Sequence, residues 1–230
     1  MTDLYHYPLC PHSRYVRLIL GELGIAPTLI EERPFERREA FLLMTPAGQT
    51  PVMVDGVTPA VPGWAPIGEY IDETRGLALG PHRLLPLSPA ARVEVRRLLD
   101  WFNVKFFNEV SNLLVTEKVY KRYMTPAQGG GGPDMDAVRA ARANLRHHLR
   151  YIGYLVRTRD WLGGRDLTYA DLAAAAHLSS VDFLGDVPWA EDETARAWYA
   201  RIKSRPAFRP LLADRLPGLT PADSYSDLDF

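Results

Sequence analysis

The sequence predicts an α/β domain followed by an all-helical domain, and three observations lead to this fold class. Short apolar runs alternate with helix-like segments through residues 1–79. A segment rich in proline and leucine, from Gly80 to Pro89, then separates two regions of different pattern. From Ala90 onward, apolar residues recur at intervals of three and four, which is typical of amphipathic helices.

The first region predicts strands where aromatic and aliphatic runs end at turn-forming residues, and helices where apolar residues recur with helical spacing. The expected strands span Leu4 to Leu9, Thr28 to Glu32 and Pro51 to Val54. The expected helices span Tyr15 to Leu23, Arg37 to Met44 and Ile67 to Arg75. A fourth strand is expected near Val57 to Val61, after the Asp55-Gly56 turn, although Pro59 and Pro62 interrupt it.

The second region predicts helices only. One long helix, or two in line, is expected from Ala90 through Val119, and Gly129 to Pro133 forms a flexible break. The later helices are expected at Val138 to Leu155, Leu172 to Leu178, Ala195 to Arg205 and Phe208 to Leu216. The alanine-rich segment Leu172 to Leu178 is apolar on all sides, which predicts the centre of the second core. The chain thus divides into a first domain (1–79), a linker (80–89), a helical domain (90–216) and a tail (217–230).

Composition predicts a globular protein of the cytoplasm. The chain has 230 residues, of which 47% are hydrophobic and 24% charged, so a core without disulfides or metal is expected. The net charge of −1 gives no general attraction for nucleic acid or an anionic membrane. A single cysteine, Cys10, excludes an internal disulfide. We expect no signal peptide, because residues 1–7 carry Asp3 and His6 and have no positive region leading into an apolar run. We expect no membrane insertion, because no stretch approaches 18 consecutive apolar residues.

Gln49-Thr50-Pro51-Val52 places a proline between a turn and a strand. Thioredoxin-like domains keep a cis-proline at this point of a β-α-β-α-β frame. A cis bond turns the backbone of the preceding residue outward, where it can pair with an extended peptide. An ordinary turn proline explains the same spacing.

Leu167-Thr168-Tyr169-Ala170-Asp171-Leu172 has the spacing of a helix capping box, with Thr168 as the cap and Asp171 in place of the usual Glu. Such a cap stabilises a helix by about 1 kcal/mol. We interpret Thr168 and Asp171 as structural residues.

Three segments together resemble the glutathione-transferase family. Gly164 to Asp171 resembles its helix-capping signature, Gly48-Gln49-Thr50-Pro51 its cis-proline loop, and Ala197 to Ala207 its penultimate helix. The resemblance covers roughly residues 2–216 and implies a thioredoxin-like domain followed by an all-helical domain. It also implies a homodimer, in which the first domain of one copy meets the second domain of the other.

The family's catalytic Tyr, Ser or Cys follows the first strand, where this sequence reads Cys10-Pro11-His12-Ser13. The positive end of the next helix would favour a reactive Cys10 thiolate, with His12 or Ser13 adding a hydrogen bond. Alternatively, Cys10 is a small apolar residue and Ser13 a helix cap. His6, Cys10 and His12 offer too few ligands at an unsuitable spacing, so no metal site is expected.

The family's anchor for glutathione is missing. Family members carry Glu-Ser or Asp-Ser at the start of the helix after the third strand, and the helix N-terminus with the Ser hydroxyl holds the γ-glutamyl carboxylate. Here Gly63-Trp64 occupies that place, and Thr58 is the nearby hydroxyl. Losing two charge-assisted hydrogen bonds costs on the order of 3–6 kcal/mol. We therefore interpret Thr50, Pro51, Gly63 and Trp64 as a degenerate glutathione site, and expect no cofactor.

The tail from Pro217 to Phe230 interleaves aspartates with apolar residues and has no basic residue. A frayed end is the usual explanation of such a segment. Alternatively, Tyr225, Leu228 and Phe230 could lay an apolar edge into a groove while the aspartates stay in water.

The missing anchors and the acidic tail resemble the FtsZ-binding branch of the glutathione-transferase family in alphaproteobacteria. The resemblance implies a non-catalytic cytoplasmic protein that binds FtsZ polymers, curves or bundles them and controls constriction at midcell. It implies that the tail contacts FtsZ, first through Asp227 and then through the neighbouring Leu228, Asp229, Phe230 and Tyr225. Lys118, Lys121 and Arg122 are candidates for meeting an acidic partner, although a solvated helix face explains them as well.

Two alternatives stay open. One is a glutathione-dependent transferase or thiol oxidoreductase that uses Cys10 or Ser13. The other is a scaffold of the same fold with a different partner.

Overall fold

The computed structural model describes residues 1–56 and 58–228, and its first domain is built on a four-stranded sheet. The strand order is β2 (Thr28–Glu31), β1 (Thr2–His6), β3 (Val52–Asp55) and β4 (Val61–Pro62). β1 pairs in parallel with β2 and antiparallel with β3, and β3 pairs antiparallel with β4. Leu4 lies opposite Met53 and both are fully buried, because the pleat turns this apolar pair toward the core.

Two strands are shorter than predicted. β1 ends at His6 rather than Leu9, because the Tyr7 carbonyl accepts a hydrogen bond from the Cys10 amide at 3.0 Å and closes a turn. The fourth strand is confined to Val61–Pro62 at the edge of the sheet, where proline is tolerated. Val57, the first residue of the predicted strand, lies outside the described residues.

The helices of the first domain are α1 (Pro11–Glu22), α2 (Glu39–Met44) and α3 (Trp64–Arg75), with a short turn η1 (Pro34–Glu36) before α2. α1 begins earlier than predicted because Pro11 occupies its first turn, where its fixed φ suits the helix. α2 begins later because Arg37 is left-handed, with φ 49°. α3 begins at Trp64, directly after Gly63, whose φ of 87° favours glycine.

A connecting segment follows α3 and is fastened to the second domain. It contains η2 (Gly76–His82), after which Leu84 and Leu85 are buried. The Leu84 carbonyl accepts a hydrogen bond from the Tyr169 amide at 3.1 Å.

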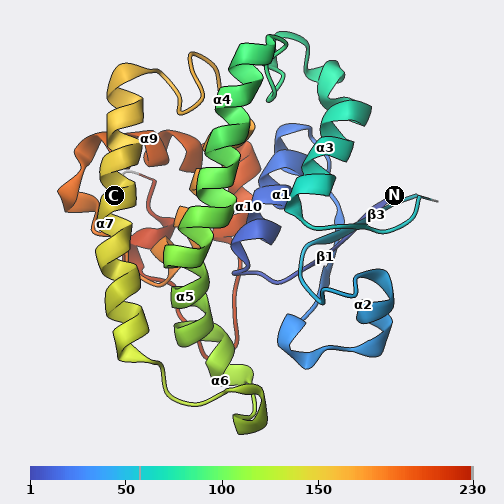
Figure 1. Ribbon diagram of the computed structural model, residues 1–230, viewed down its shortest axis with the longest axis vertical. Coiled ribbons are helices and arrows are strands. Elements are labelled where there is room, and N and C mark those ends of the chain that lie inside the picture. Colours follow the sequence, from blue (N-terminus) through green and yellow to red (C-terminus); the bar gives the residue numbers. More distant parts are fainter. Residues whose placement is uncertain (57, 229–230) are drawn as a thin grey trace.

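A single long helix crosses the second domain (Figure 1), which is one of the two arrangements that the sequence pattern allowed. Its consecutive parts are α4 (Pro89–Asp100), η3 (Trp101–Ser111), α5 (Asn112–Val115), η4 (Thr116–Tyr120) and α6 (Lys121–Tyr123). The junction residues keep right-handed helical dihedrals, while η3 and η4 are wound as wider π turns. The helix stops at Met124, and η5 (Pro126–Gln128) leads into the glycine-rich break.

The remaining helices pack around this long helix. α7 (Met135–Thr158) runs beside it in Figure 1, and α8 (Tyr169–Phe183) packs against α1 and η3. After η6 (Trp189–Glu191), the chain forms α9 (Glu193–Lys203), η7 (Pro206–Phe208), α10 (Arg209–Leu212) and η8 (Asp223–Ser226). α10 is shorter than the predicted helix to Leu216, because Leu216 instead pairs with Leu219 in a β-bridge.

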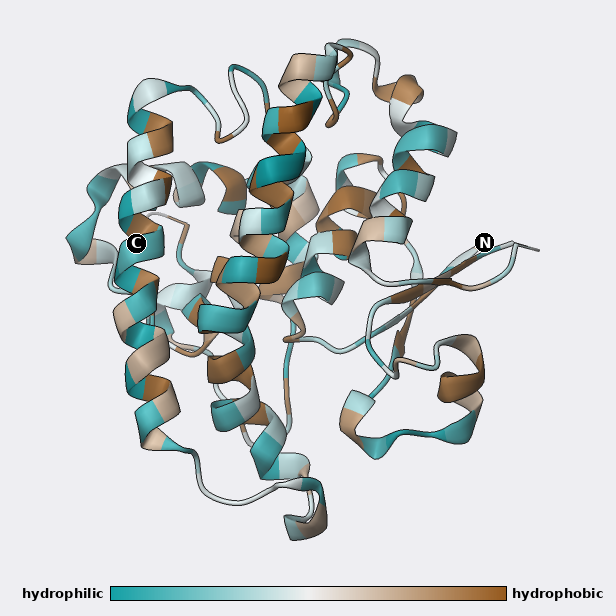
Figure 2. Ribbon diagram, in the orientation of Figure 1, coloured by the Kyte–Doolittle hydropathy of each residue, from teal (hydrophilic) through white to brown (hydrophobic). Residues whose placement is uncertain are grey.

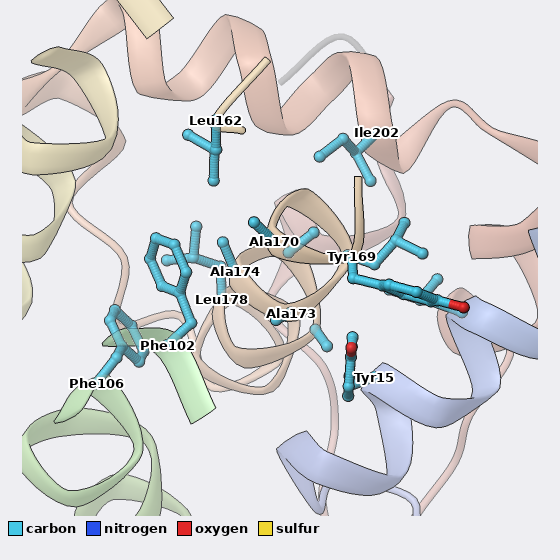
Figure 3. Packing of buried hydrophobic residues seen from close by; sticks show 14 of the residues in the cluster. Tyr15, Phe102, Phe106, Leu162, Tyr169, Ala170, Ala173, Ala174, Leu178 and Ile202 are labelled. Carbon is cyan, nitrogen blue, oxygen red and sulfur yellow. The ribbon is translucent and has the colours of Figure 1, made fainter. Parts of the chain in front are cut away.

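α8 is the centre of the molecule. Every residue from Tyr169 to Phe183 is buried, so an alanine-rich sequence without a polar face is required there. Figure 3 shows Ala170, Ala173, Ala174 and Leu178 of α8 between Phe102 and Phe106 on one side and Tyr15 on the other. Figure 2 shows hydrophobic residues along the inner faces of the surrounding helices and hydrophilic residues outside.

The thioredoxin-like sheet followed by helices confirms the predicted fold class. Within residues 1–56 and 58–228, no helix is both long and apolar enough to cross a membrane.

Candidate functional site

The loop after β1 carries Cys10, the residue that would act in a thiol enzyme. Cys10 is the N-cap of α1 and is only 6% exposed. Its Sγ donates to the Thr50 carbonyl over 3.6 Å, and the Thr50–Pro51 bond is cis, which confirms the predicted cis-proline. The carbonyl that precedes the cis-proline is thus occupied by a hydrogen bond from within the chain.

The neighbours of Cys10 are turned away from the thiol. Ser13 is fully buried, and its Oγ accepts from the Tyr7 amide at 3.4 Å. His12 Nε2 lies 2.9 Å from the Asn103 carbonyl in the second domain. The expected support of Cys10 by His12 or Ser13 is therefore replaced by bonds that join the loop to itself and to η3. Ser13 is not the helix cap either, because Cys10 holds that position.

Aromatic rings from both domains cover this loop. The Tyr7 ring packs edge-on against Tyr120 of η4 at 5.2 Å and against Phe35 of η1 at 6.4 Å between centroids. Phe35 and Tyr120 also contact each other at 5.7 Å. Burial raises the pKa of the Tyr7 and Tyr120 phenols, so both are neutral at physiological pH. Cys10 is buried in the same cluster as Tyr7, against which Tyr120 packs, so these rings limit access to its thiol.

The start of α3 carries an indole where the family carries a hydroxyl. Trp64 is the first residue of α3, and its ring stacks on His12 at 5.9 Å and meets Tyr15 edge-on at 6.3 Å. The nearby Thr58 hydroxyl bonds to the Asp55 carbonyl at 2.9 Å, within its own turn. The residues present therefore do not fit the γ-glutamyl carboxylate of glutathione.

Thr168 and Asp171 form the predicted capping box at the start of α8. The buried Asp171 carboxylate accepts from the Thr168 amide and hydroxyl at 3.0 and 2.9 Å. It also accepts from the Leu162 amide at 2.8 Å and from Trp198 Nε1 at 3.1 Å. This arrangement is structural, as the sequence indicates.

The tail returns to the body of the protein. Tyr225 is fully buried, and its ring meets Phe183 of α8 at 5.2 Å between centroids. The sequence pattern instead predicts Tyr225 on an apolar edge that a partner's groove would receive. The Tyr225 hydroxyl is held by Arg14 of α1, a buried arginine that the sequence analysis did not single out. Asp227 and Leu228 are exposed, Leu228 by 40%. Asp229 and Phe230 lie outside the described residues.

The basic candidates lie near the C-terminal end of α8, close to the tail. Lys118 Nζ contacts Asp186 Oδ2 at 2.6 Å and the Leu184 carbonyl at 3.3 Å. The neighbouring Phe183 carbonyl accepts from the tail amide of Ala222 at 3.0 Å. Two segments far apart in the sequence thus converge on one end of α8.

Lys118 and Arg122 also line a small hollow of about 140 Å³ together with Pro133 and Val138. Lys121 pairs with Glu117 at 2.5 Å, whereas Arg122 is exposed. Arg122 is therefore the most accessible of the three predicted basic residues.

A larger cleft of about 870 Å³ lies between α3 and α4. Glu69 and Glu73 of α3 line one wall, and Arg92 and Arg96 of α4 line the other. The sequence analysis missed this cleft, although each pair has the four-residue spacing that places two side chains on one helix face. What the sequence does not reveal is that the two faces oppose each other.

Known proteins resemble this chain over its whole length. Residues 4–81 match the family model for the N-terminal domain of glutathione S-transferase. FtsZ-localized protein A of Caulobacter vibrioides is 46% identical over 99% of this chain and 97% of its own. The crystal structure of a glutathione S-transferase from Sinorhizobium meliloti is 49% identical, with a TM-score of 0.97 and all of both chains covered. The structure of FzlA from C. crescentus is 46% identical, with a TM-score of 0.91 over 100% of this chain and 99% of that one.

Proposed function

This chain belongs to the glutathione S-transferase family, and from that premise we propose that it acts as a partner of FtsZ in cell division rather than as a glutathione-dependent enzyme. It binds FtsZ polymers, curves or bundles them, and so controls constriction from the cytoplasm at the division site. The observation that carries the proposal is the full-length similarity to FtsZ-localized protein A.

The geometry of the crevice supports a binding role. The ring of Trp64, the first residue of α3, stacks on His12, and Cys10 is buried in a cluster with Tyr7, against which Tyr120 packs. A glutathione molecule would have to displace these side chains without gaining the carboxylate anchor of the family. We therefore expect no cofactor and no catalytic residue.

The exposed end of the tail, Asp227 and Leu228, supplies the FtsZ contact, with Asp229 and Phe230 continuing it. Arg122 of α6, and Lys118 of η4 beside the end of α8, extend the contact toward acidic groups of the polymer. An exposed aspartate, Asp227, beside the exposed Leu228 suits a groove that is apolar at its floor and basic at its rim.

The thiol-enzyme alternative rests on Cys10, which caps a helix of twelve residues. Two parallel measurements on one preparation separate the proposals: calorimetric titration with glutathione to several millimolar, and co-sedimentation with FtsZ and GTP. We expect no heat of binding and protein in the FtsZ pellet. Micromolar glutathione affinity, turnover that Cys10→Ala erases, and an empty pellet would establish the enzyme instead.

The tail contact is tested by reversing one charge. Asp227→Lys should remove the protein from the FtsZ pellet, because it brings a cation to a surface that selects an anion. Asp223→Lys makes the same change at another exposed position of the tail and should leave the pellet unchanged. Equal pelleting of both variants would show that the tail end is not the contact.

We further propose a homodimer that closes the cleft between α3 and α4. A second copy would enter the cleft, so that the acidic wall of each copy meets the basic wall of the other as well as facing its own, and a two-fold axis makes this contact occur twice. Val93, which is 67% exposed in the cleft, would become buried at the interface.

A further inference from the structure

The tail is docked along its described length. The Tyr123 hydroxyl donates to the Pro217 carbonyl at 2.5 Å, and the Ala222 amide donates to the Phe183 carbonyl at 3.0 Å. The buried Lys203 Nζ donates to the Ser224 carbonyl at 3.2 Å. These contacts come from α6, α8 and α9, so the whole helical domain contributes to holding the tail.

The innermost of these contacts is made by Tyr225. Its hydroxyl accepts from Arg14 Nη1 at 2.8 Å and donates to the Leu211 carbonyl at 3.0 Å. Its ring is buried with Leu216 and Phe183 in a cluster that also contains Cys10. Tyr225 is thus bound both through its ring and through its hydroxyl.

Arg14 is itself held rigidly. Its fully buried guanidinium donates to the Pro8 carbonyl at 2.7 Å, to Ser179 Oγ at 2.9 Å and to Asp214 Oδ2 at 3.0 Å. Arg17 fixes Asp214 in turn with bonds of 2.8 and 2.9 Å. A buried charge is costly unless its donors are satisfied, so the Tyr225 hydroxyl fills a place that the Arg14 network requires.

We propose that Tyr225 is a positioning residue, which docks on Arg14 and thereby holds Asp227 and Leu228 in the orientation that an FtsZ polymer binds. This inference rests on the proposed function. Only Ser226 separates Tyr225 from Asp227, and the Asp227 amide donates back to the Ser224 carbonyl at 3.2 Å. The docked tyrosine and this turn together fix the direction in which the exposed end leaves the surface.

The docking site uses the loop that holds the catalytic residue in the family's enzymes. The Pro8 carbonyl, two residues before Cys10, is one of the acceptors that orient Arg14. A tail released from Arg14 would sample many orientations, and only the docked fraction would bind. The apparent dissociation constant for FtsZ polymers then rises in inverse proportion to the docked fraction.

Tyr225→Phe tests the inference, because it keeps the ring and removes only the hydroxyl. Hydrogen exchange of the free protein should become faster at the amides of residues 224–228 and unchanged in α8. Co-sedimentation should show an apparent dissociation constant for FtsZ polymers raised about tenfold or more, since the variant loses the bond from the charged Arg14 donor and the bond to the Leu211 carbonyl. Ser179→Ala removes a bond from the same Arg14 Nη1 but does not contact the tail. The affinity of this variant for FtsZ polymers should therefore stay within about twofold of the parent's.

The outcomes separate this inference from the proposed function. Faster exchange in the tail with unchanged affinity would overturn the positioning role, as would unchanged exchange. Equal weakening by Ser179→Ala would also overturn it, since the effect would then belong to the Arg14 network and not to the tail. If the parent protein itself stays out of the FtsZ pellet, the proposed function fails and the positioning role falls with it, whatever the exchange data show.

Discussion

His12, near the start of α1, contacts residues of both domains. Its ring lies between Trp64 and Phe107, at 5.9 and 4.3 Å, and its Nε2 is 2.9 Å from the Asn103 carbonyl. Burial lowers the pKa of His12 from 6.5 to about 4, so the ring is neutral at physiological pH. The neutral ring joins α1 to η3 of the second domain by packing and by one hydrogen bond.

This lowered pKa predicts a loss of stability in acid. Between about pH 6.5 and pH 4 the unfolded chain binds a proton at His12 and the folded chain does not, so the free energy of unfolding falls as pH falls. When the pH is lowered from 7 to 5, the free energy of unfolding should therefore fall by about 2 kcal/mol less in His12→Phe than in the parent. Denaturant titrations at both pH values measure the difference.

The control is the same substitution at an exposed histidine, His82→Phe, whose pH dependence should match the parent. The buried His6, His148 and His177 also have lowered pKa values and also lower the free energy of unfolding in acid. They remain in both variants, so they do not affect the comparison. If His12→Phe lost as much stability in acid as the parent, His12 would have to be protonated in the folded protein.

At the scale of the element, α8 depends on its capping box more than a surface helix depends on its cap. Asp171→Ala should lower the free energy of unfolding by about 3 kcal/mol or more, because it leaves buried donors of Leu162, Thr168 and Trp198 without an acceptor. Thr168→Ala should cost about 1–2 kcal/mol. Denaturant titration at neutral pH measures both.

Asp134 provides the matched comparison, since it caps α7 through the amides of Asp136 and Ala137 at an exposed position. Asp134→Ala should cost about 1 kcal/mol. Equal losses for Asp134→Ala and Asp171→Ala would mean that the buried bonds of Asp171 add nothing to an ordinary cap.

At the scale of the whole molecule, the cleft between α3 and α4 predicts how two copies pair. Glu73→Arg and Arg96→Glu should each weaken the proposed dimer, because each variant sets like charges against each other across the two-fold axis. An equimolar mixture should recover a heterodimer in which both contacts again join opposite charges. Sedimentation at matched concentrations measures the masses.

Arg150→Glu, a charge reversal at an exposed position of α7 outside the cleft, should keep the mass of the parent. If the mixture of Glu73→Arg and Arg96→Glu stayed monomeric while each variant was folded, these two residues would not face each other in the dimer.

Local residue patterns determined much of this protein. The strand and helix order and the capping box of Thr168 and Asp171 follow from neighbours within a few positions, because caps and amphipathic faces are local interactions. The cis-proline at Pro51 is expected from the resemblance to the family's cis-proline loop, because the spacing alone also suits an ordinary turn proline. Gly63-Trp64, which we propose replaces the family's anchor, is likewise visible in residue types alone. Element ends shifted by a few residues where a single dihedral decided them, as at Arg37.

Only the tertiary structure decided what the tail does. Arg14 and Tyr225 are separated by 211 positions, and no periodicity predicts that an arginine on the first helix is buried and needs a hydroxyl acceptor. The opposed walls of the cleft and the packing of Phe35 against Tyr120 across the two domains have the same origin. Such contacts form where the fold brings distant segments together and removes water, so their strength depends on burial that the chain acquires only when it is folded.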